Sequence, residues 1–449
     1  MKTPERRNGR PSLSRVHVRP TALCVAILAA AFSDGADAAR LNYRLEGLGL
    51  HSDNINLSES DEQAETVFAP RLAFDFKEEG SAVEIQARGE IERRFYSGNA
   101  FDDETRSGFA GQLNWSLFPE RLNLVVEDYL SEEPINFRDG RFPGNLQQVN
   151  VFVAGPTFFA RFGDATRLKL DVRGADTYAE ETAGFDSKRY GAAAALEHDI
   201  RSTSKVSLNL AYTNVDFDDS DPAIAIDYDR EDAFVRYNGK LRNIDYELDG
   251  GYSRLKRDLA SDESTAIGRA TVQWHPDPHN RLSFRARHQF ADAVQDIVLR
   301  LRDSDEVLIP DLMAPSDSLV TSGTYRQNYY DLDYRFSGER FGFRARPLYR
   351  KLRYVDPGNS DRTERALVFQ ASYRLRPRMT VMLDGAERRR EFLTQDETDR
   401  DHVYGLAMEY QLTRHWGWRA DVFKNDRSSD VPEARYKENA VQFKVWWQR

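Results

Sequence analysis

Cysteine is almost absent from this chain: the single one, Cys24, lies within the apolar run TALCVAILAAAF at residues 21–32. Six Lys and Arg residues precede that run, and the small-residue site Ala36-Asp37-Ala38 follows it. A basic segment, a short apolar segment and a small-x-small site are typical of a secretory signal peptide. We therefore predict a signal peptide over residues 1–38 and an exported mature chain, residues 39–449, without disulfides or thiol chemistry.

Long apolar runs and an excess of positive charge are also lacking. No segment beyond the signal peptide approaches 18 consecutive apolar residues, which excludes membrane-spanning helices. Without the six basic and three acidic residues of the signal peptide, 57 Lys and Arg face 70 Asp and Glu. The formal charge of −13 disfavours DNA or RNA as a partner, because nucleic-acid binding depends on neutralising phosphates.

The sequence does contain a repeated alternation of apolar and polar residues, which is typical of β-strands with two different faces. In RFGFRARPLYRKLRY (340–354), Phe341 and Phe343 fall on one face, and Arg344, Arg346 and Arg350 fall on the other. In a transmembrane barrel, one face meets lipid and the other meets a water-filled lumen. A mean hydropathy of −0.67 with 12% aromatic residues fits strands that are only half apolar.

Such stretches follow one another without a domain break near residues 41–51, 65–76, 81–96, 106–117, 121–131, 147–162, 166–178, 185–200, 203–217, 227–239, 242–255, 264–275, 280–293, 323–337, 340–354, 364–376, 379–392, 401–412, 415–425 and 433–448. Short connections such as FPER (118–121) alternate with long acidic ones such as FDDSDPAIAIDYD (217–229). We therefore predict an all-β fold, a single closed antiparallel transmembrane barrel of about 20 strands, with 18 as the alternative. Short periplasmic turns, long extracellular loops, the outer membrane of a Gram-negative cell as location, and lipids, lipopolysaccharide and the barrel-assembly machinery as partners follow from this fold.

Tryptophan is placed as this fold requires. Five of the six tryptophans lie within a few residues of a short turn or of the C-terminus: Trp115, Trp274, Trp416, Trp418 and Trp447. Amphipathic aromatic rings gather at membrane–water interfaces. The pattern predicts an aromatic belt on the periplasmic side.

The polar face of the strands between residues 264 and 392 is strongly basic. Its predicted pore-lining arginines are Arg269, Arg285, Arg287, Arg335, Arg344, Arg346, Arg350, Arg374 and Arg388. The strand at 242–255 has the opposite sign, with Asp245, Glu247 and Asp249 toward the pore. Arginines around a pore select for anions, and carboxylates on the opposite wall would add a transverse field. Charges that are merely paired to stabilise the lumen are the alternative interpretation.

The connection at 291–322 is the longest, and it carries an apolar cluster that is unusual for a free extracellular loop. Its members include Ile297, Leu299, Leu308, Ile309 and Leu312. Long loops in compact proteins are commonly functional lids. We predict a lid that folds into the lumen; two additional strands above the membrane are the alternative.

Signals for catalysis or metal binding are weak. The chain has no G-x-S-x-G elbow, no glycine-rich phosphate loop and no H-E-x-x-H motif. HPDPH (275–279) could ligate a metal but also fits a proline-stiffened turn. His51 beside Asp53, and Asp401 beside His402, are rim candidates for hydrolysis that fit ordinary loop residues better. We expect no enzyme activity, no cofactor and no metal.

Two segments carry a family resemblance. HSDNINLSESDEQAETVFAPRLAFDF (51–76) and LFPERLNLVVEDYLSEEP (117–134) are similar to a family of exopolysaccharide-associated outer-membrane β-barrels grouped with porins. The resemblance implies a channel that assists exopolysaccharide export, with the polymer and its export proteins as partners. A porin for uptake or diffusion of small anionic solutes is the alternative, and an outer-membrane enzyme or adhesion scaffold is a third hypothesis.

Overall fold

The computed structural model describes residues 39–98, 100–219, 221, 224–258, 260–303, 320–356 and 361–449; the expected signal peptide lies outside these ranges. The described residues form one antiparallel sheet of 20 strands. The strands are β1 (Arg40–Ser52), β2 (Glu65–Glu79), β3 (Val83–Tyr96), β4 (Glu104–Phe118), β5 (Leu122–Pro134), β6 (Leu146–Phe162), β7 (Thr166–Ala179), β8 (Ser187–Arg201), β9 (Ser204–Phe217), β10 (Tyr228–Lys240), β11 (Ile244–Arg257), β12 (Glu263–Asp277), β13 (Asn280–Ala291), β14 (Tyr325–Ser337), β15 (Phe341–Tyr354), β16 (Arg362–Arg376), β17 (Met379–Phe392), β18 (Glu397–Gln411), β19 (Trp416–Ser429) and β20 (Tyr436–Gln448).

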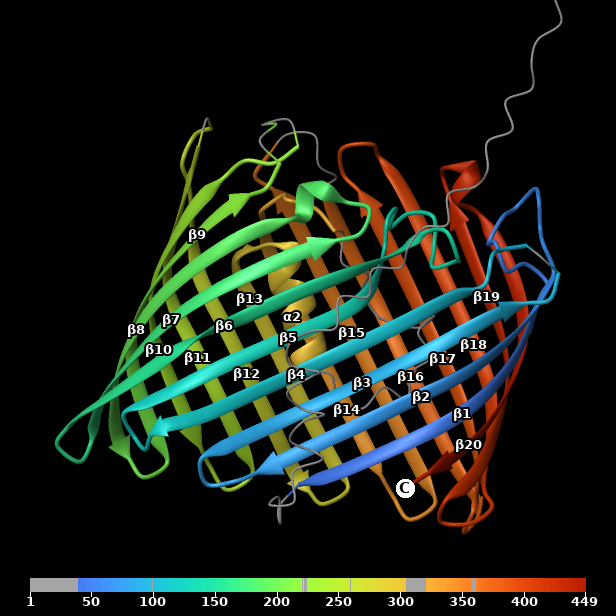
Figure 1. The fold of residues 1–449 in the computed structure, drawn as a ribbon, viewed down its shortest axis with the longest axis horizontal. Coiled ribbons are helices and arrows are strands. Elements are labelled where there is room, and N and C mark those ends of the chain that lie inside the picture. Colours follow the sequence, from blue (N-terminus) through green and yellow to red (C-terminus); the bar gives the residue numbers. More distant parts are fainter. Residues whose placement is uncertain are drawn as a thin grey trace, which may run out of the picture.

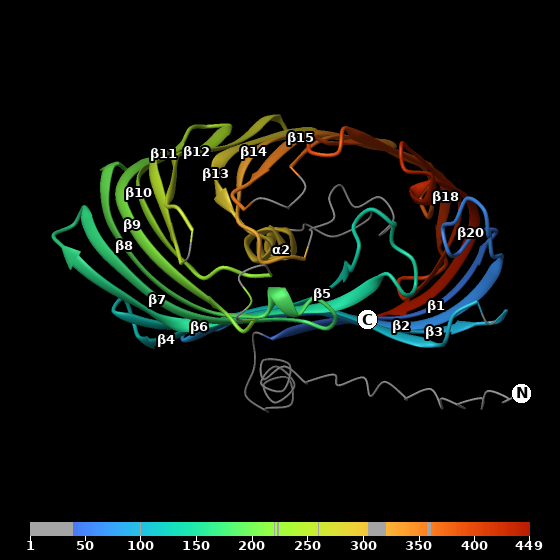
Figure 2. The ribbon, with the colours of Figure 1, turned by 90° about the horizontal axis from the view of Figure 1, so that it is seen from above.

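Each strand pairs with the next one along the chain, and β1 pairs with β20, from Arg44 opposite Gln448 to Ser52 opposite Ala440. This last pairing closes the sheet into a barrel and removes its free edges. The predicted all-β barrel and its 20 strands are thereby confirmed, and the alternative of 18 is excluded. Figure 1 shows the strands running obliquely to the barrel axis, and Figure 2 shows an oval cross-section.

The two ends of the barrel differ in their connections. At one end the hairpin turns are only two to four residues long, and both termini of the sheet lie there. Tight turns use unusual backbone angles: Gly163, in the β6–β7 turn, has a φ of 73°, which glycine adopts without steric cost. At the other end the loops range from four residues, between β17 and β18, to 33 residues, between β13 and β14.

The period-two pattern sorts side chains between the two faces of the sheet. On neighbouring strands the leucines Leu383 and Leu406 and the valine Val422 are 48%, 52% and 48% exposed and form part of an outward apolar band. Residues one position away, such as Asp384, Ala407 and Asp421, are buried toward the interior. The tryptophans Trp115, Trp274 and Trp416 are exposed near the short turns, and Tyr43 makes an edge-on contact with Trp447 at 5.4 Å.

Little helix is present among the described residues. Helix α2 (Ala293–Asp303) follows β13, and two single turns, η1 (Ala183–Phe185) and η3 (Pro432–Ala434), lie in loops. Seen from above, α2 lies inside the ring of strands (Figure 2). Within the described parts of the chain, no helix is both long and apolar enough to cross a bilayer.

Candidate functional site

The inward face of β13, β14 and β15 carries arginines that share aspartates. Asp331 on β14 is paired with Arg285 of β13 at 3.3 Å and with Arg346 of β15 at 2.5 Å. Asp333, two residues further along β14, is paired with Arg335 at 3.0 Å and Arg344 at 2.8 Å. The register places these side chains on adjacent inward positions of neighbouring strands. Each carboxylate therefore contacts two guanidinium groups but neutralises only one unit of positive charge.

The same arrangement occurs on both sides of this sector. Asp249 of β11 lies between Arg236 of β10, at 2.8 Å, and Arg269 of β12, at 2.7 Å. Asp401 of β18 is shared by Arg388, at 2.9 Å, Arg390, at 3.2 Å, and Arg427. We call these groups the shared-aspartate clusters: Asp249, Asp331, Asp333 and Asp401 with the arginines just named.

The predicted carboxylate wall is not opposite to the arginines. β11 is the direct neighbour of β12, and Asp249 is ion-paired with Arg269. Glu247 also approaches Arg236, at 3.2 Å, and Asp245 approaches Lys240, at 3.9 Å. The expectation of an opposed acidic wall is wrong, because Asp245, Glu247 and Asp249 lie beside the basic strands and interleave with their arginines.

Three further predicted arginines lie apart from these clusters. Arg374 is exposed near the short-turn end, where it donates a hydrogen bond to the Glu339 carbonyl at 3.2 Å. The Arg287 guanidinium lies over the Tyr329 ring at 5.5 Å. Arg350 is only 4% exposed, and it pairs with Asp296 of helix α2.

Helix α2 is attached to several walls of the barrel by charged side chains. Asp292, just before the helix, accepts hydrogen bonds from Arg189 of β8 and from the Tyr228 hydroxyl of β10, the latter at 2.8 Å. It also caps the helix by accepting a bond from the Gln295 backbone N–H at 2.7 Å. Burial alone would raise the pKa of Asp292, but Arg189 and the Gln295 N–H stabilise the carboxylate and lower the pKa to about 2.

The other attachments of α2 reach different strands. Asp296 pairs with Arg350 of β15 and accepts from the Tyr325 hydroxyl of β14. Arg300 pairs with Glu133 of β5, and the side chain of Arg88 from β3 donates to the Leu301 carbonyl. The helix is thus connected to walls on both sides of the lumen.

An apolar cluster holds α2 against β5 and β6. Ala293, Val294 and Ile297 are buried with Tyr129 and with the β6 valines Val149 and Val151. Ile297 is fully buried, so it contributes on the order of 1.5–3 kcal/mol of hydrophobic stabilisation. Of the predicted lid residues, Ile297 packs against the wall and Leu299 lines a cavity described below, whereas Leu308, Ile309 and Leu312 lie outside the described residues.

The β5–β6 loop also extends into the barrel, which the sequence analysis missed (Figure 2). The Arg138 guanidinium lies over Phe392 of β17 at 4.1 Å, and the Phe137 ring lies beneath Arg362 of β16 at 4.7 Å. Arg390 of β17 donates to the Phe137 carbonyl at 3.0 Å. The available signal was the alternation of aromatic and basic residues in NFRDGRF (136–142) with glycines at 140 and 144. In the structure these two glycines have positive φ, 86° at Gly140 and 89° at Gly144.

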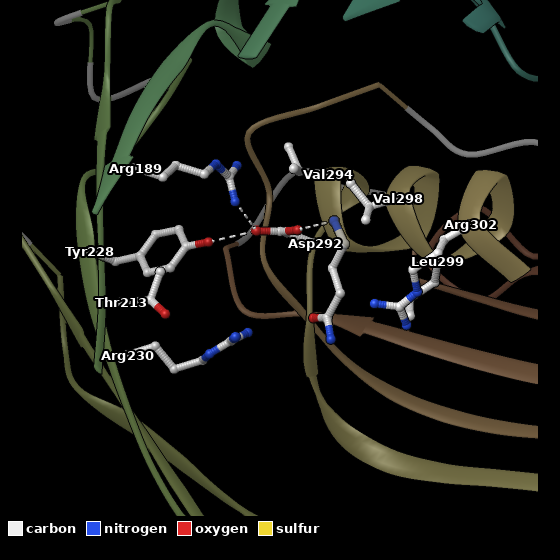
Figure 3. A pocket seen from close by; sticks show the side chains of 10 residues that line it. Arg189, Thr213, Tyr228, Arg230, Asp292, Val294, Val298, Leu299 and Arg302 are labelled. Carbon is white, nitrogen blue, oxygen red and sulfur yellow. Dashed lines mark hydrogen bonds and ion pairs between the residues drawn. The ribbon is translucent and has the colours of Figure 1, made fainter. Parts of the chain in front are cut away.

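Between α2 and the wall of β8–β10 lies a cavity of about 300 Å³ (Figure 3). Its polar lining is Arg189, Thr213, Tyr228, Arg230, Asp292, Gln295 and Arg302, and its apolar lining is Val294, Val298 and Leu299. The volume is at the lower end of the range for small-molecule sites, about 300–1,000 Å³.

The weak metal and hydrolase candidates have structural roles in this fold. Asp277 accepts backbone hydrogen bonds from His279 and Asn280 and so closes the β12–β13 turn. His51 bonds to Thr66, and Asp401 is held by arginines. Among the described residues, no three His, Cys, Asp or Glu side chains are placed to hold a metal ion.

A closed barrel with an apolar outer band and a charged lumen, narrowed by α2 and the β5–β6 loop, is a porin-like channel of the outer membrane. A family model described as putative beta-barrel porin 2 matches residues 354–449, the part of the chain that forms β16–β20. No curated protein matches this sequence.

Solved structures with a similar arrangement of strands include outer-membrane proteins of two organisms. They are the FrpB iron transporter from Neisseria meningitidis, F5-1 variant (8% identity, TM-score 0.44, 91% of this chain and 82% of that one), OpdK from Pseudomonas aeruginosa (11%, 0.38, 91% and 99%) and OprD from the same organism (11%, 0.36, 93% and 98%). At these values the likeness concerns barrel architecture alone.

Proposed function

We propose that this barrel is a channel for small anionic solutes. The observation that carries the proposal is the charge of the inward face of β13–β15, where seven arginines accompany only two aspartates. These arginines are Arg281, Arg285, Arg287, Arg335, Arg344, Arg346 and Arg350. Asp296 of α2 adds one further negative charge, so positive charge remains in excess in this sector.

Guanidinium groups suit this task for two reasons. They stay protonated at any physiological pH, and their planar donors match the geometry of a carboxylate. A solute carboxylate can contact the outer N–H groups of an arginine whose inner N–H groups already hold Asp331 or Asp333. Helix α2 and the β5–β6 loop narrow the lumen, so a solute passes within about one Debye length, roughly 8–10 Å, of these charges.

The test is the reversal potential of the purified channel in planar bilayers under a KCl gradient. The wild type should prefer chloride, and the double variant Arg344→Gln/Arg346→Gln should lose much of that preference. A matched control is Arg326→Gln/Arg353→Gln, which removes the same amount of charge from the exposed outer face of β14 and β15. Cation preference in the wild type would contradict the proposal.

Assisted export of an acidic exopolysaccharide is the second candidate. It is favoured by the resemblance of residues 51–76 and 117–134 to exopolysaccharide-associated barrels, and by shared-aspartate clusters that recur from β10 to β19. A polymer would require α2 and the β5–β6 loop to move aside, because both cross the lumen. Deleting the gene should leave polymer inside the periplasm if export is the role, and should impair growth on small organic acids if uptake is the role.

A further inference from the structure

The cavity between α2 and β8–β10 has the chemistry of a binding site for an organic anion. Three guanidinium groups line it, from Arg189, Arg230 and Arg302, against one carboxylate, Asp292. The Arg189 and Tyr228 side chains converge on that carboxylate from the barrel wall (Figure 3). The wall therefore already recognises a carboxylate, one that belongs to the chain itself.

Arg230 is the group best placed to receive a second carboxylate. Its guanidinium extends from β10 toward the cavity beside Asp292 (Figure 3). Among the described residues its ion pair is a long one: Nε lies 3.4 Å from a carboxylate oxygen of Asp232 and makes no hydrogen bond there. A guanidinium held by one long ion pair keeps N–H groups that can donate charge-assisted hydrogen bonds to a bound carboxylate.

The other residues that line the cavity fit a small ligand with several hydroxyl groups. Thr213 of β9 and Gln295 of α2 supply hydrogen-bonding groups from two different elements. Val294, Val298 and Leu299 form an apolar surface contributed by α2. A sugar ring has both characters, hydroxyl groups at its edge and C–H groups on its face.

We propose that this cavity binds a sugar acid of monosaccharide size, with its carboxylate on Arg230 and its ring between Thr213 and the apolar side of α2. The proposal rests on the proposed anion channel and names the solute class that it would recognise. The same chemistry is present in a free sugar acid and in the terminal residue of an acidic polysaccharide.

Calorimetry on the purified, detergent-solubilised barrel tests the site. Glucuronate should bind the wild type, and methyl glucoside, which has the same ring without the charge, should bind far more weakly. Arg230→Gln should weaken glucuronate binding about tenfold or more, as expected when a hydrogen bond to a charged group is lost. Lys188→Gln is the matched control, because it removes one positive charge from the exposed outer face of β8, next to Arg189.

A second variant keeps the test informative if Arg230→Gln fails to fold. Val298→Trp retains every charge but fills the cavity, so it should abolish glucuronate binding while the chloride preference in KCl is unchanged. A short glucuronate oligomer serves as the third probe: binding as tight as that of the monomer indicates a polymer end, and much weaker binding indicates a free acid.

The outcomes separate this site from the function on which it rests. Chloride preference without glucuronate binding, or equal binding of glucuronate and methyl glucoside, would overturn the site and leave the anion channel intact. Glucuronate binding in a cation-preferring channel would overturn the channel proposal but leave the site. Binding that survives both Arg230→Gln and Val298→Trp would place the ligand elsewhere.

Discussion

A single carboxylate held by two or more arginines is the recurring unit of the lumen. Asp331 is an example: Arg285 and Arg346 are partly buried on the two strands that flank β14 and would repel one another, and the carboxylate between them accepts hydrogen bonds from both. Removing the aspartate would leave this partly buried positive charge uncompensated, whereas a second aspartate would cancel the positive potential. Stability of the wall and attraction for anions thus come from the same side chains.

Asp292 is the residue at which pH should act on the lumen. Its pKa is lowered to about 2, so its ionised attachment to Arg189 and Tyr228 is fully present above its ordinary pKa of about 3.9 and is lost as the pH falls through about 2. We expect single-channel conductance to be constant from neutral pH to about pH 4 and to rise between about pH 4 and pH 2, as the start of α2 is released.

The variant Asp292→Asn should show the raised conductance already at neutral pH, since the amide cannot carry the charge that holds Arg189. Asp258→Asn, in the exposed β11–β12 loop, is the control and should behave as the wild type. A wild-type conductance that changes between pH 7 and pH 5 would show that another group controls the helix.

Helix α2 is the element that sets the width of the lumen on the β5–β6 side. Its position depends on the buried Ile297 and on ion pairs to β5, β8 and β15. Deleting residues 294–303 should therefore raise single-channel conductance several-fold without loss of the folded barrel. Conductance and heat-modifiable electrophoretic mobility are the two measurements; an unchanged conductance would mean that the ion path does not pass beside the helix.

The strands, by contrast, should depend on their outward residues. Leu406 lies between Leu383 and Val422 on the outward face, and it is about five residues from the short-turn end of β18. A membrane-spanning strand has about 9–11 residues, so this position is close to the bilayer midplane. Leu406→Arg should lower the free energy of unfolding in lipid by about 2–4 kcal/mol. Leu412→Arg, in the β18–β19 turn, should cost about 1 kcal/mol or less, and equal costs would contradict the assigned membrane position.

At the scale of the whole molecule, the sequence determines the barrel more completely than the lumen. Alternation around Phe341 and Arg344 identifies each strand and its two faces because both depend on neighbouring residues alone. The pairing of Asp249 with Arg269, and the insertion of Phe137 beneath Arg362, depend on which strands become neighbours and on loops that cross the barrel. The helical form of residues 293–303 also could not be predicted from the sequence, because a short apolar run fits a helix or a strand until its packing partners are known.

The distribution of charge over the whole molecule leads to a final prediction. Residues 39–449 have a formal charge of −13, yet the inward face of β13–β15 is basic, so the acidic residues are concentrated elsewhere, including the long loops. At about 0.1 M salt the Debye length is about 10 Å, and an ion in the constriction senses the arginines but not the outer loops. At about 1 M salt the Debye length falls to about 3 Å, and the charge of the arginines is screened. At about 0.01 M it rises to about 30 Å, so the negative charge of the outer loops also reaches the constriction and reduces the positive potential there. Chloride preference should therefore be greatest near 0.1 M and decline on either side, as measured by reversal potentials at a constant salt ratio. A preference that rises steadily toward low salt would mean that the outer carboxylates lie beyond the reach of the pore.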